Sequence, residues 1–229
     1  MSYLLEFPPR GPLPSKARSP PYVLFGINGD DCFHHFPPEV PLDVVLHYVP
    51  KLKQWILPIP SLSPKAQKMA LTKPYIGIDI LGPFRAEAVS EIVVRMLQHA
   101  GVLLPRKNFY IHPTIRFSIA IQEAWLAFEL PIAGLANLHT HMQALLTHGP
   151  PIQDSEMRTL WGMFPITSPI IYEMGMNYVR SLLEKQYTQS QVSTIRLWHA
   201  GDREPKTFFE KLESQFPQLD TARSEIFAE

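Results

Sequence analysis

Short apolar runs separated by a turn signal open the patterned part of the chain. Tyr22–Ile27 is apolar and aromatic, and Asn28-Gly29-Asp30-Asp31 follows it directly. An Asn-Gly pair is the residue combination most typical of a tight hairpin turn. We therefore predict a β-hairpin whose second strand is Cys32–Phe36.

The apolar spacing then changes from strand-like to helical. A first short helix is predicted from residues three and four apart, namely Leu42, Val45, Leu46 and Val49. Pro50 interrupts this spacing, and a second short helix is predicted from Leu52, Trp55 and Ile56. Residues 58–73 have the composition of a loop. Every second residue from Ile76 to Ile80 is isoleucine, so Pro74–Leu81 is predicted to be a strand.

The rest of the chain is helical in pattern. The clearest stripe stops before Gly101 and consists of Val89, Ile92, Val93, Met96, Leu97 and Ala100. Ser155 is predicted to cap a later helix, and Ser168-Pro169 to open another. Thr188 and Gln191 have the spacing of a capping box. Three early strands followed by many helices predict an α+β fold in which helix dominates.

Proline content marks the N-terminus as a separate segment. The 229 residues include 24 prolines, about twice the average fraction, and several of them fall within residues 1–21. We predict a Pro-rich flexible leader at 1–21, a first domain at 22–148, a helical extension at 149–217 and a frayed tail at 218–229.

Charge and cysteine content exclude several classes of protein. The 21 basic and 21 acidic side chains give a formal net charge of zero, which offers no field for nucleic acid or an anionic membrane. The best basic cluster, Arg106-Lys107 with Arg116, is too small for much phosphate affinity. Cys32 is the single cysteine, as suits a reducing compartment. Residues 1–21 lack the apolar core of a signal peptide, and no stretch is long and apolar enough to span a membrane. We expect an intracellular protein, cytoplasmic or nuclear, with no membrane partner.

Candidate catalytic and metal-binding residues do not assemble into a motif. On a helix, His139 and His141 point about 200° apart, and on a strand the neighbours His34-His35 face opposite sides. Cys32 follows two aspartates, whose charges raise a thiol pKa. Alternation places Asp79 on the solvated face of its strand. The nucleophile elbow and the Gly-rich phosphate loops are missing. We predict no catalytic, cofactor-binding or metal-binding residues, and therefore no enzyme.

One alternative stays open in the helical half. Methionine and aromatic residues there are more typical of core but are also able to line a groove: Met157, Trp161, Met163, Phe164, Met174, Met176 and Tyr178. The alternative hypothesis is a ligand-binding or enzymatic helical domain whose pocket lies near Trp125, His139, Trp161 and Tyr172.

The order of elements over residues 22–148 resembles the BTB/POZ domain. The hairpin formed by Val23–Ile27 and Cys32–Phe36 is similar to the one that opens that family. The segment from Val45 to Leu52 is similar to the family's helix–Ser-Pro-x-Phe segment, with Val49 and Leu52 in place of the serine and phenylalanine.

The resemblance continues beyond these first elements. Ile76–Leu81 is similar to the third strand of the family, Phe84 to Gly101 to the helix that follows, and Ala120 to Leu146 to the closing helical pair. Two departures are His99-Ala100-Gly101, where the family has Tyr-Thr-Gly, and the long insertion at 102–114. Prolines between compact helical blocks are similar in style to the diverged fungal branch.

The resemblance implies a dimerising interaction module that has no catalytic residues. We therefore predict a non-enzymatic protein–protein interaction adaptor, or scaffold, that forms a homodimer through residues 22–148. The helices at 149–217 would recruit an unidentified protein partner, and no nucleic-acid partner is expected.

Overall fold

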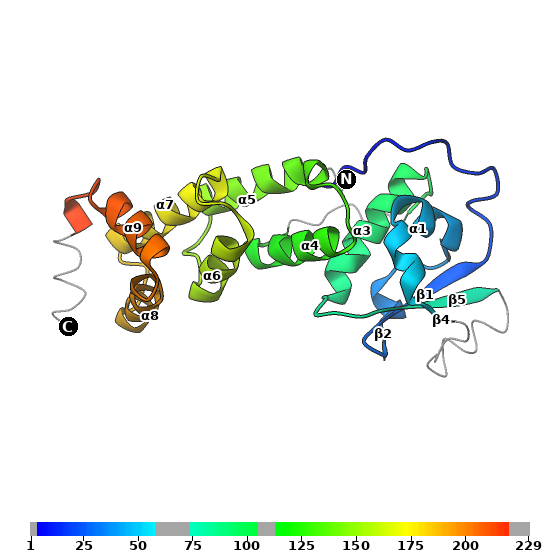
Figure 1. Ribbon diagram of the computed structural model, residues 1–229, viewed down its shortest axis with the longest axis horizontal. Coiled ribbons are helices and arrows are strands. Elements are labelled where there is room, and N and C mark those ends of the chain that lie inside the picture. The colour runs from blue at the N-terminus through cyan, green and yellow to red at the C-terminus, as the bar shows by residue number, and fades with distance from the viewer. Residues whose placement is uncertain (1–3, 58–73, 105–112, 220–229) are drawn as a thin grey trace. The chain divides into compact units, whose positions relative to one another are not determined.

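The computed structural model describes residues 4–57, 74–104 and 113–219 (Figure 1). The predicted loop at 58–73, Arg106-Lys107 and residues 220–229 of the predicted tail lie outside these ranges. The fold is α+β and helix-dominant, with a small N-terminal sheet followed by a helical C-terminal region, as the sequence predicts.

The chain divides into two compact units, Met1–Leu138 and His139–Glu229. The sequence placed the boundary after residue 148, so the observed division is earlier and falls within helix α5 (Ala136–His148). Side-chain contacts explain the difference, because the two ends of α5 are bonded within different units. Near its start, Asn137 Nδ2 donates to Glu6 Oε1 at 2.9 Å. Near its end, the Leu146 carbonyl accepts from Asn177 Nδ2 at 2.8 Å.

The sheet of the first unit is built around a parallel strand pair. Strands β1 (Tyr22–Ile27) and β5 (Tyr75–Ile80) pair in register along their whole length. Strands β2 (Asp30–Asp31) and β3 (Val40–Pro41) pair antiparallel with β1, and β4 (Ile56–Leu57) pairs antiparallel with β5. The path β2-β1-β5-β4, with β3 also on β1, gives five strands where three were predicted.

The predicted hairpin turn forms at Asn28-Gly29. Ile27 pairs with Asp30, and the left-handed φ angles of +53° at Asn28 and +85° at Gly29 are those of a two-residue hairpin loop. The Asn28 side-chain amide exchanges two hydrogen bonds with the Gly82 backbone, at 2.8 and 2.9 Å. The turn is therefore fastened to the residue just beyond β5.

The second strand of the hairpin was predicted at Cys32–Phe36, and this prediction is wrong, because β2 is Asp30–Asp31 and ends before Cys32. Residues Phe33–His35 form the 3₁₀ helix η1 instead. The cause is local hydrogen bonding, since the Phe33 N–H donates to Asp31 Oδ1 at 3.0 Å and the His35 N–H to the Cys32 carbonyl at 2.9 Å. An aspartate side chain that captures a nearby backbone N–H offers the chain an alternative to strand pairing.

Helices cover one side of this sheet. The predicted helix pair around Pro50 is present as α1 (Leu42–Tyr48) and the 3₁₀ helix η2 (Pro50–Trp55), although Ile56, predicted in the second helix, belongs to β4. Helix α3 (Ala86–His99) packs beside α1 (Figure 1). The predicted stripe of α3 is fully buried, and Gly101 with φ +70° ends the helix as predicted. The unit continues with α4 (Ile115–Ala127) and the 3₁₀ helix η4 (Ile132–Leu135).

The predicted flexible leader instead packs on the first unit. Leu4, Leu5 and Phe7 are buried, and the Leu5 carbonyl accepts from Arg95 Nε at 2.6 Å. The Phe7 ring lies 4.9 Å from Trp125 and 5.0 Å from Tyr48. The proline content predicted flexibility for this whole segment, but the apolar residues before the prolines are buried in the core of the first unit.

Four further helices lie in the described part of the second unit, up to residue 219. They are α6 (Asp154–Met163), α7 (Pro169–Leu183), α8 (Gln189–Ala200) and α9 (Arg203–Glu213). The caps predicted at Ser168 and Thr188 form, including the box with Gln191. The cap predicted at Ser155 is wrong, because the N-cap of α6 is Gln153, two residues earlier. Leu219, in the predicted frayed tail, is buried.

A polar clamp on α7 holds the connection between α5 and α6. Asn177 is almost completely buried; its Nδ2 donates to the Leu146 and Pro150 carbonyls, and its Oδ1 accepts from the Ile152 N–H at 2.9 Å. Arg180 donates to the carbonyls of Thr147 and Gly149. These side chains satisfy backbone groups that the end of α5 would otherwise leave unpaired.

Candidate functional site

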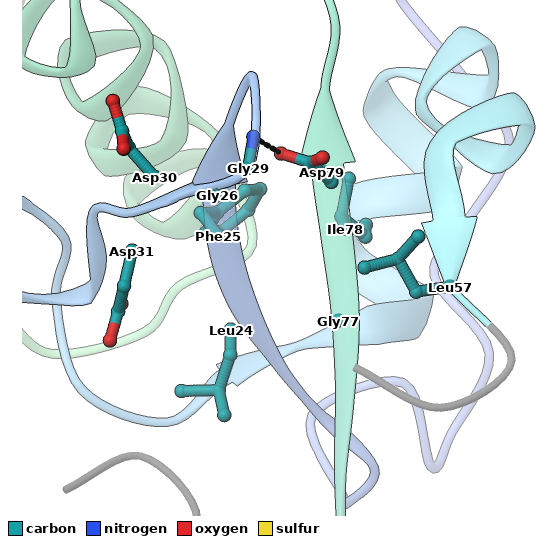
Figure 2. Close-up of a pocket in the computed structure, with 10 residues that line it drawn as sticks. All are labelled: Leu24, Phe25, Gly26, Gly29, Asp30, Asp31, Leu57, Gly77, Ile78 and Asp79. Carbon is teal, nitrogen blue, oxygen red and sulfur yellow. Dashed lines mark hydrogen bonds between the residues drawn. The ribbon is translucent and has the colours of Figure 1, made fainter. Parts of the chain in front are cut away.

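A small pocket lies at the end of the sheet, next to the hairpin turn. Residues of β1, β2, β4 and β5 line it, together with Gly29 of the turn (Figure 2). Its volume is about 50 Å³, far below the ~300 Å³ at which small-molecule sites begin. The pocket therefore has no room for an organic substrate.

The three carboxylates of this pocket do not converge. Asp79 Oδ1 accepts from the Gly29 N–H at 3.0 Å, whereas Asp30 and Asp31 lie on the other side of β1 (Figure 2). A Cβ at Gly26 would come within 3.0 Å of the same Asp79 oxygen, so this glycine makes room for the carboxylate. Asp79 is half-buried and fastens the turn, which differs from the simply solvated position that alternation predicts.

The histidines that the structure describes and the cysteine are not grouped into a metal-binding site. His34 and His35, expected on opposite faces of a strand, lie on η1 with ring centroids 4.0 Å apart. Cys32 is buried, and its thiol pKa is raised chiefly by that burial and further by Asp30 and Asp31. Across the described ranges, no three His, Cys, Asp or Glu side chains are grouped so as to hold a metal ion.

The four residues of the alternative pocket have separate surroundings. Trp125 is fully buried in the first unit, where its Nε1 donates to the Pro131 carbonyl at 2.8 Å. In the second unit, the His139 ring stands edge-on to Phe164, and burial lowers its pKa. Trp161 packs against the rings of Trp198 and Phe208. Tyr172 is 48% exposed and is the one of the four that lines a groove.

That groove is a concave surface of the second unit. It has a volume of about 780 Å³ and runs along α9 and the start of α7. Its apolar lining consists of Ile166, Tyr172, Phe208 and Leu212. Charged residues of both signs stand beside them, namely Asp202, Arg203, Glu204 and Lys211. An apolar lining with polar groups around it is the composition of a surface that binds another molecule.

The wall of this groove depends on close packing of α9 against α7. Gly175 lies at their contact, where an added Cβ would come within 2.5 Å of Leu212 Cδ2 and 2.9 Å of Phe208 Cε1. Trp161 supports Phe208 from α6, with ring centroids 5.4 Å apart. Trp161 therefore contributes to the groove indirectly, through the side chain that lines it.

Sequence reasoning named Tyr172 but missed the groove. The predicted Met and aromatic stripe is mainly core, since Met157, Met174 and Tyr178 are fully buried. A signal for α9 was present, because its apolar residues Phe208 and Leu212 are four positions apart and lie on one face of a helix that is otherwise rich in charge. Nothing in the spacing showed that Ile166 and Tyr172 would lie next to them.

Comparisons with protein-family models, curated proteins and solved structures return no match. In the part of the chain that the structure describes, no helix combines the length and apolarity needed to cross a bilayer.

Proposed function

We propose that this chain is a non-enzymatic interaction adaptor that self-associates through its N-terminal α+β half and recruits a protein partner through its C-terminal helices. The observation that carries the proposal is the arrangement of the first unit. Its helix pair around Pro50, strand β5 and following helix α3 come in the order on which the resemblance to a BTB/POZ domain depends, whereas Cys32–Phe36 does not form the strand that the resemblance implies. The single buried thiol suits an intracellular location.

We assign self-association to exposed apolar side chains of the first unit. Among the described residues of the first unit, large apolar side chains are exposed to solvent at Leu81, Leu103, Leu126 and Ile132. Burying such side chains on dimer formation contributes favourable free energy in proportion to the apolar area removed from water.

The groove of the second unit is the surface that we assign to the recruited partner. Ile166 and Tyr172 are exposed there and leave apolar surface that a partner would cover. The charges around the groove are mixed, because Asp202 and Glu204 accompany Arg203 and Lys211. We therefore expect a peptide or helix that offers apolar anchor side chains and carries both signs of charge, rather than a polyanion.

Light scattering across a concentration series tests self-association of the full chain. A mass near 52 kDa, twice the 26.2 kDa of one chain, that persists on dilution would support the proposal. A stable monomer at low micromolar concentration would contradict it.

Charge substitutions then locate the interface. Glutamate at Leu81, Leu103, Leu126 or Ile132 should convert the dimer to a monomer at one or more of these positions. Leu197→Glu is the matched control, since Leu197 is also an exposed leucine, with 76% of its surface open to solvent, but belongs to the second unit. If Leu197→Glu alone dissociated the dimer, the interface would lie in the second unit, which would contradict the proposal.

The alternative of a ligand-binding helical domain has one observation in its favour. The groove volume of about 780 Å³ lies within the range of about 300–1,000 Å³ typical of small-molecule sites. A thermal-shift screen of a small-molecule library distinguishes the two functions. Stabilisation that Tyr172→Ala abolishes would favour a ligand over a protein partner.

A further inference from the structure

The N-terminal leader is pinned at two points and exposed between them. Upstream, Leu5 and Phe7 are buried, and the Glu6 N–H donates to the Gly134 carbonyl at 2.9 Å. Downstream, Ala17 is fully buried and its N–H donates to the Pro14 carbonyl at 2.9 Å. We call residues 8–16, which lie between these two anchors, the proline arch.

Most of the proline arch is exposed to solvent, and it forms no helix or strand; its end at residues 14–16 belongs to a turn in which the Pro14 and Lys16 carbonyls accept hydrogen bonds from Ala17 and Ser19. Residues 9–12 and 14–16 are exposed, and residues 5–14 carry neither helix nor strand. Figure 1 shows this segment as an open loop that runs outside helices α1 and α3. Its backbone is therefore accessible to another molecule along its length.

The residue types restrict the arch to extended conformations. Proline has φ fixed near −65°, and a residue that precedes proline is pushed towards extended or polyproline II geometry. Across 8–14, the sequence PPRGPLP leaves Arg10 as the one residue under neither restriction. In polyproline II, with three residues per turn, Pro9 and Pro12 project from the same face.

We infer that the proline arch is a second docking site, which fits a protein domain with an aromatic-lined groove for proline-rich segments. Such grooves accept paired Xaa-Pro units three residues apart, which Pro8-Pro9 and Gly11-Pro12 supply. The exposed Arg10 and Lys16 select for acidic residues beside the partner's groove. Anchoring at both ends lowers the conformational entropy lost on binding. This site is separate from the groove on α9 and does not depend on the proposed function.

The test uses the full chain and a panel of purified SH3 and WW domains. We expect saturable binding to at least one domain with a dissociation constant below about 1 mM, measured by calorimetry. Chemical shifts of the isotope-labelled domain should change at the aromatic residues of its groove. Binding that leaves those residues unchanged, or no saturable binding across the panel, would overturn the inference.

Substitutions within the arch make the test specific. Pro9→Ala and Pro12→Ala should each weaken binding by about tenfold, because each removes one of the paired units. Pro14→Ala is the matched control, since Pro14 is exposed but projects from a different face in polyproline II; its effect should stay within about twofold. If all three variants lost the same affinity, or none lost any, the partner domain would not be binding the arch as a paired proline motif.

Discussion

Asn177 shows how much of the second unit depends on one polar side chain. It is a buried amide on α7, and its hydrogen bonds to Leu146, Pro150 and Ile152 all go to backbone groups around the α5–α6 connection. A buried backbone group without a partner costs about 1–3 kcal/mol. The clamp thus stabilises an irregular segment that has no helix or strand ladder to satisfy it.

Asn177→Ala should lower the free energy of unfolding by about 3 kcal/mol, because it leaves several buried backbone groups without a hydrogen-bond partner at once. Urea denaturation of the purified chain measures the change. Asn137→Ala is the control, since that amide makes an exposed side-chain hydrogen bond to Glu6 and should cost less than about 1 kcal/mol. Equal losses in the two variants would contradict the clamp.

His139 makes the stability of the second unit dependent on pH. Burial against Phe164 lowers its pKa below the value of about 6.5 expected in the unfolded chain. The folded state therefore binds its proton less readily than the unfolded state. This contribution to stability is fully present above about pH 6.5 and is lost as the pH falls towards the lowered pKa of the folded state.

Unfolding free energies at pH 7.5, 6.5 and 5.5 test this dependence. His139→Gln should flatten the decrease on acidification, because glutamine does not titrate. His148→Gln removes an exposed histidine of the same helix and should leave the pH slope as in the parent chain. An unchanged slope in His139→Gln would show that other groups cause the decrease.

At the scale of elements, glycine content decides how closely helices approach. Two glycines lie within helices of the second unit but in different surroundings: Gly162 on α6 faces open space, and Gly175 on α7 contacts the side chains of α9. Alanine in a helix is favoured over glycine by about 1 kcal/mol, whereas overpacking costs about 1–3 kcal/mol. The same substitution therefore has different consequences at the two positions.

Gly162→Ala should stabilise the chain by up to about 1 kcal/mol, and Gly175→Ala should be neutral or destabilising because its methyl group meets Leu212 and Phe208. Thermal and urea unfolding give the comparison. Gly175→Ala should also weaken any partner bound in the groove, since Phe208 and Leu212 line it. A gain in stability equal to that of Gly162→Ala would contradict close packing of α9 on α7.

At the scale of the whole molecule, the N-terminal segment completes the core of the first unit. Phe7 contacts residues that are far away in sequence, including Tyr48 of α1 and Trp125 of α4. The burial of Leu5 and Phe7 ties the start of the chain to elements formed much later along it. Removal of this segment would expose apolar surface on α1, α3 and α4.

Phe7→Ala should lower the free energy of unfolding by about 3–5 kcal/mol, as expected for loss of a buried phenylalanine. Tryptophan fluorescence reports the transition, because Trp125 lies against the lost ring. Leu197→Ala serves as the control, since Leu197 is 76% exposed, lies outside the proposed self-association surface and should have no measurable effect. A loss below about 1 kcal/mol for Phe7→Ala would show that the leader is only loosely attached.

Local signals in the sequence determined a large part of this fold. The Asn28-Gly29 turn, the interruption at Pro50, the alternation in β5 and the caps at Ser168 and Thr188 all form as predicted. Each depends on properties of neighbouring residues: a permitted left-handed φ, a missing N–H, a period of two, or a side chain that reaches a nearby backbone group. The BTB/POZ resemblance and the adaptor function that it implies stay predictions.

The tertiary structure decided what depends on contacts between distant residues. Burial of the leader required the surface supplied by α1, α3 and α4, and the groove required α9 to lie against the start of α7. Asn177 carried no local signal of its role, because its partners lie about 30 positions earlier in the chain. The sequence named Tyr172 through its residue type alone. Its position beside Phe208 and Leu212 follows from helix packing, which a linear pattern of apolar residues does not specify.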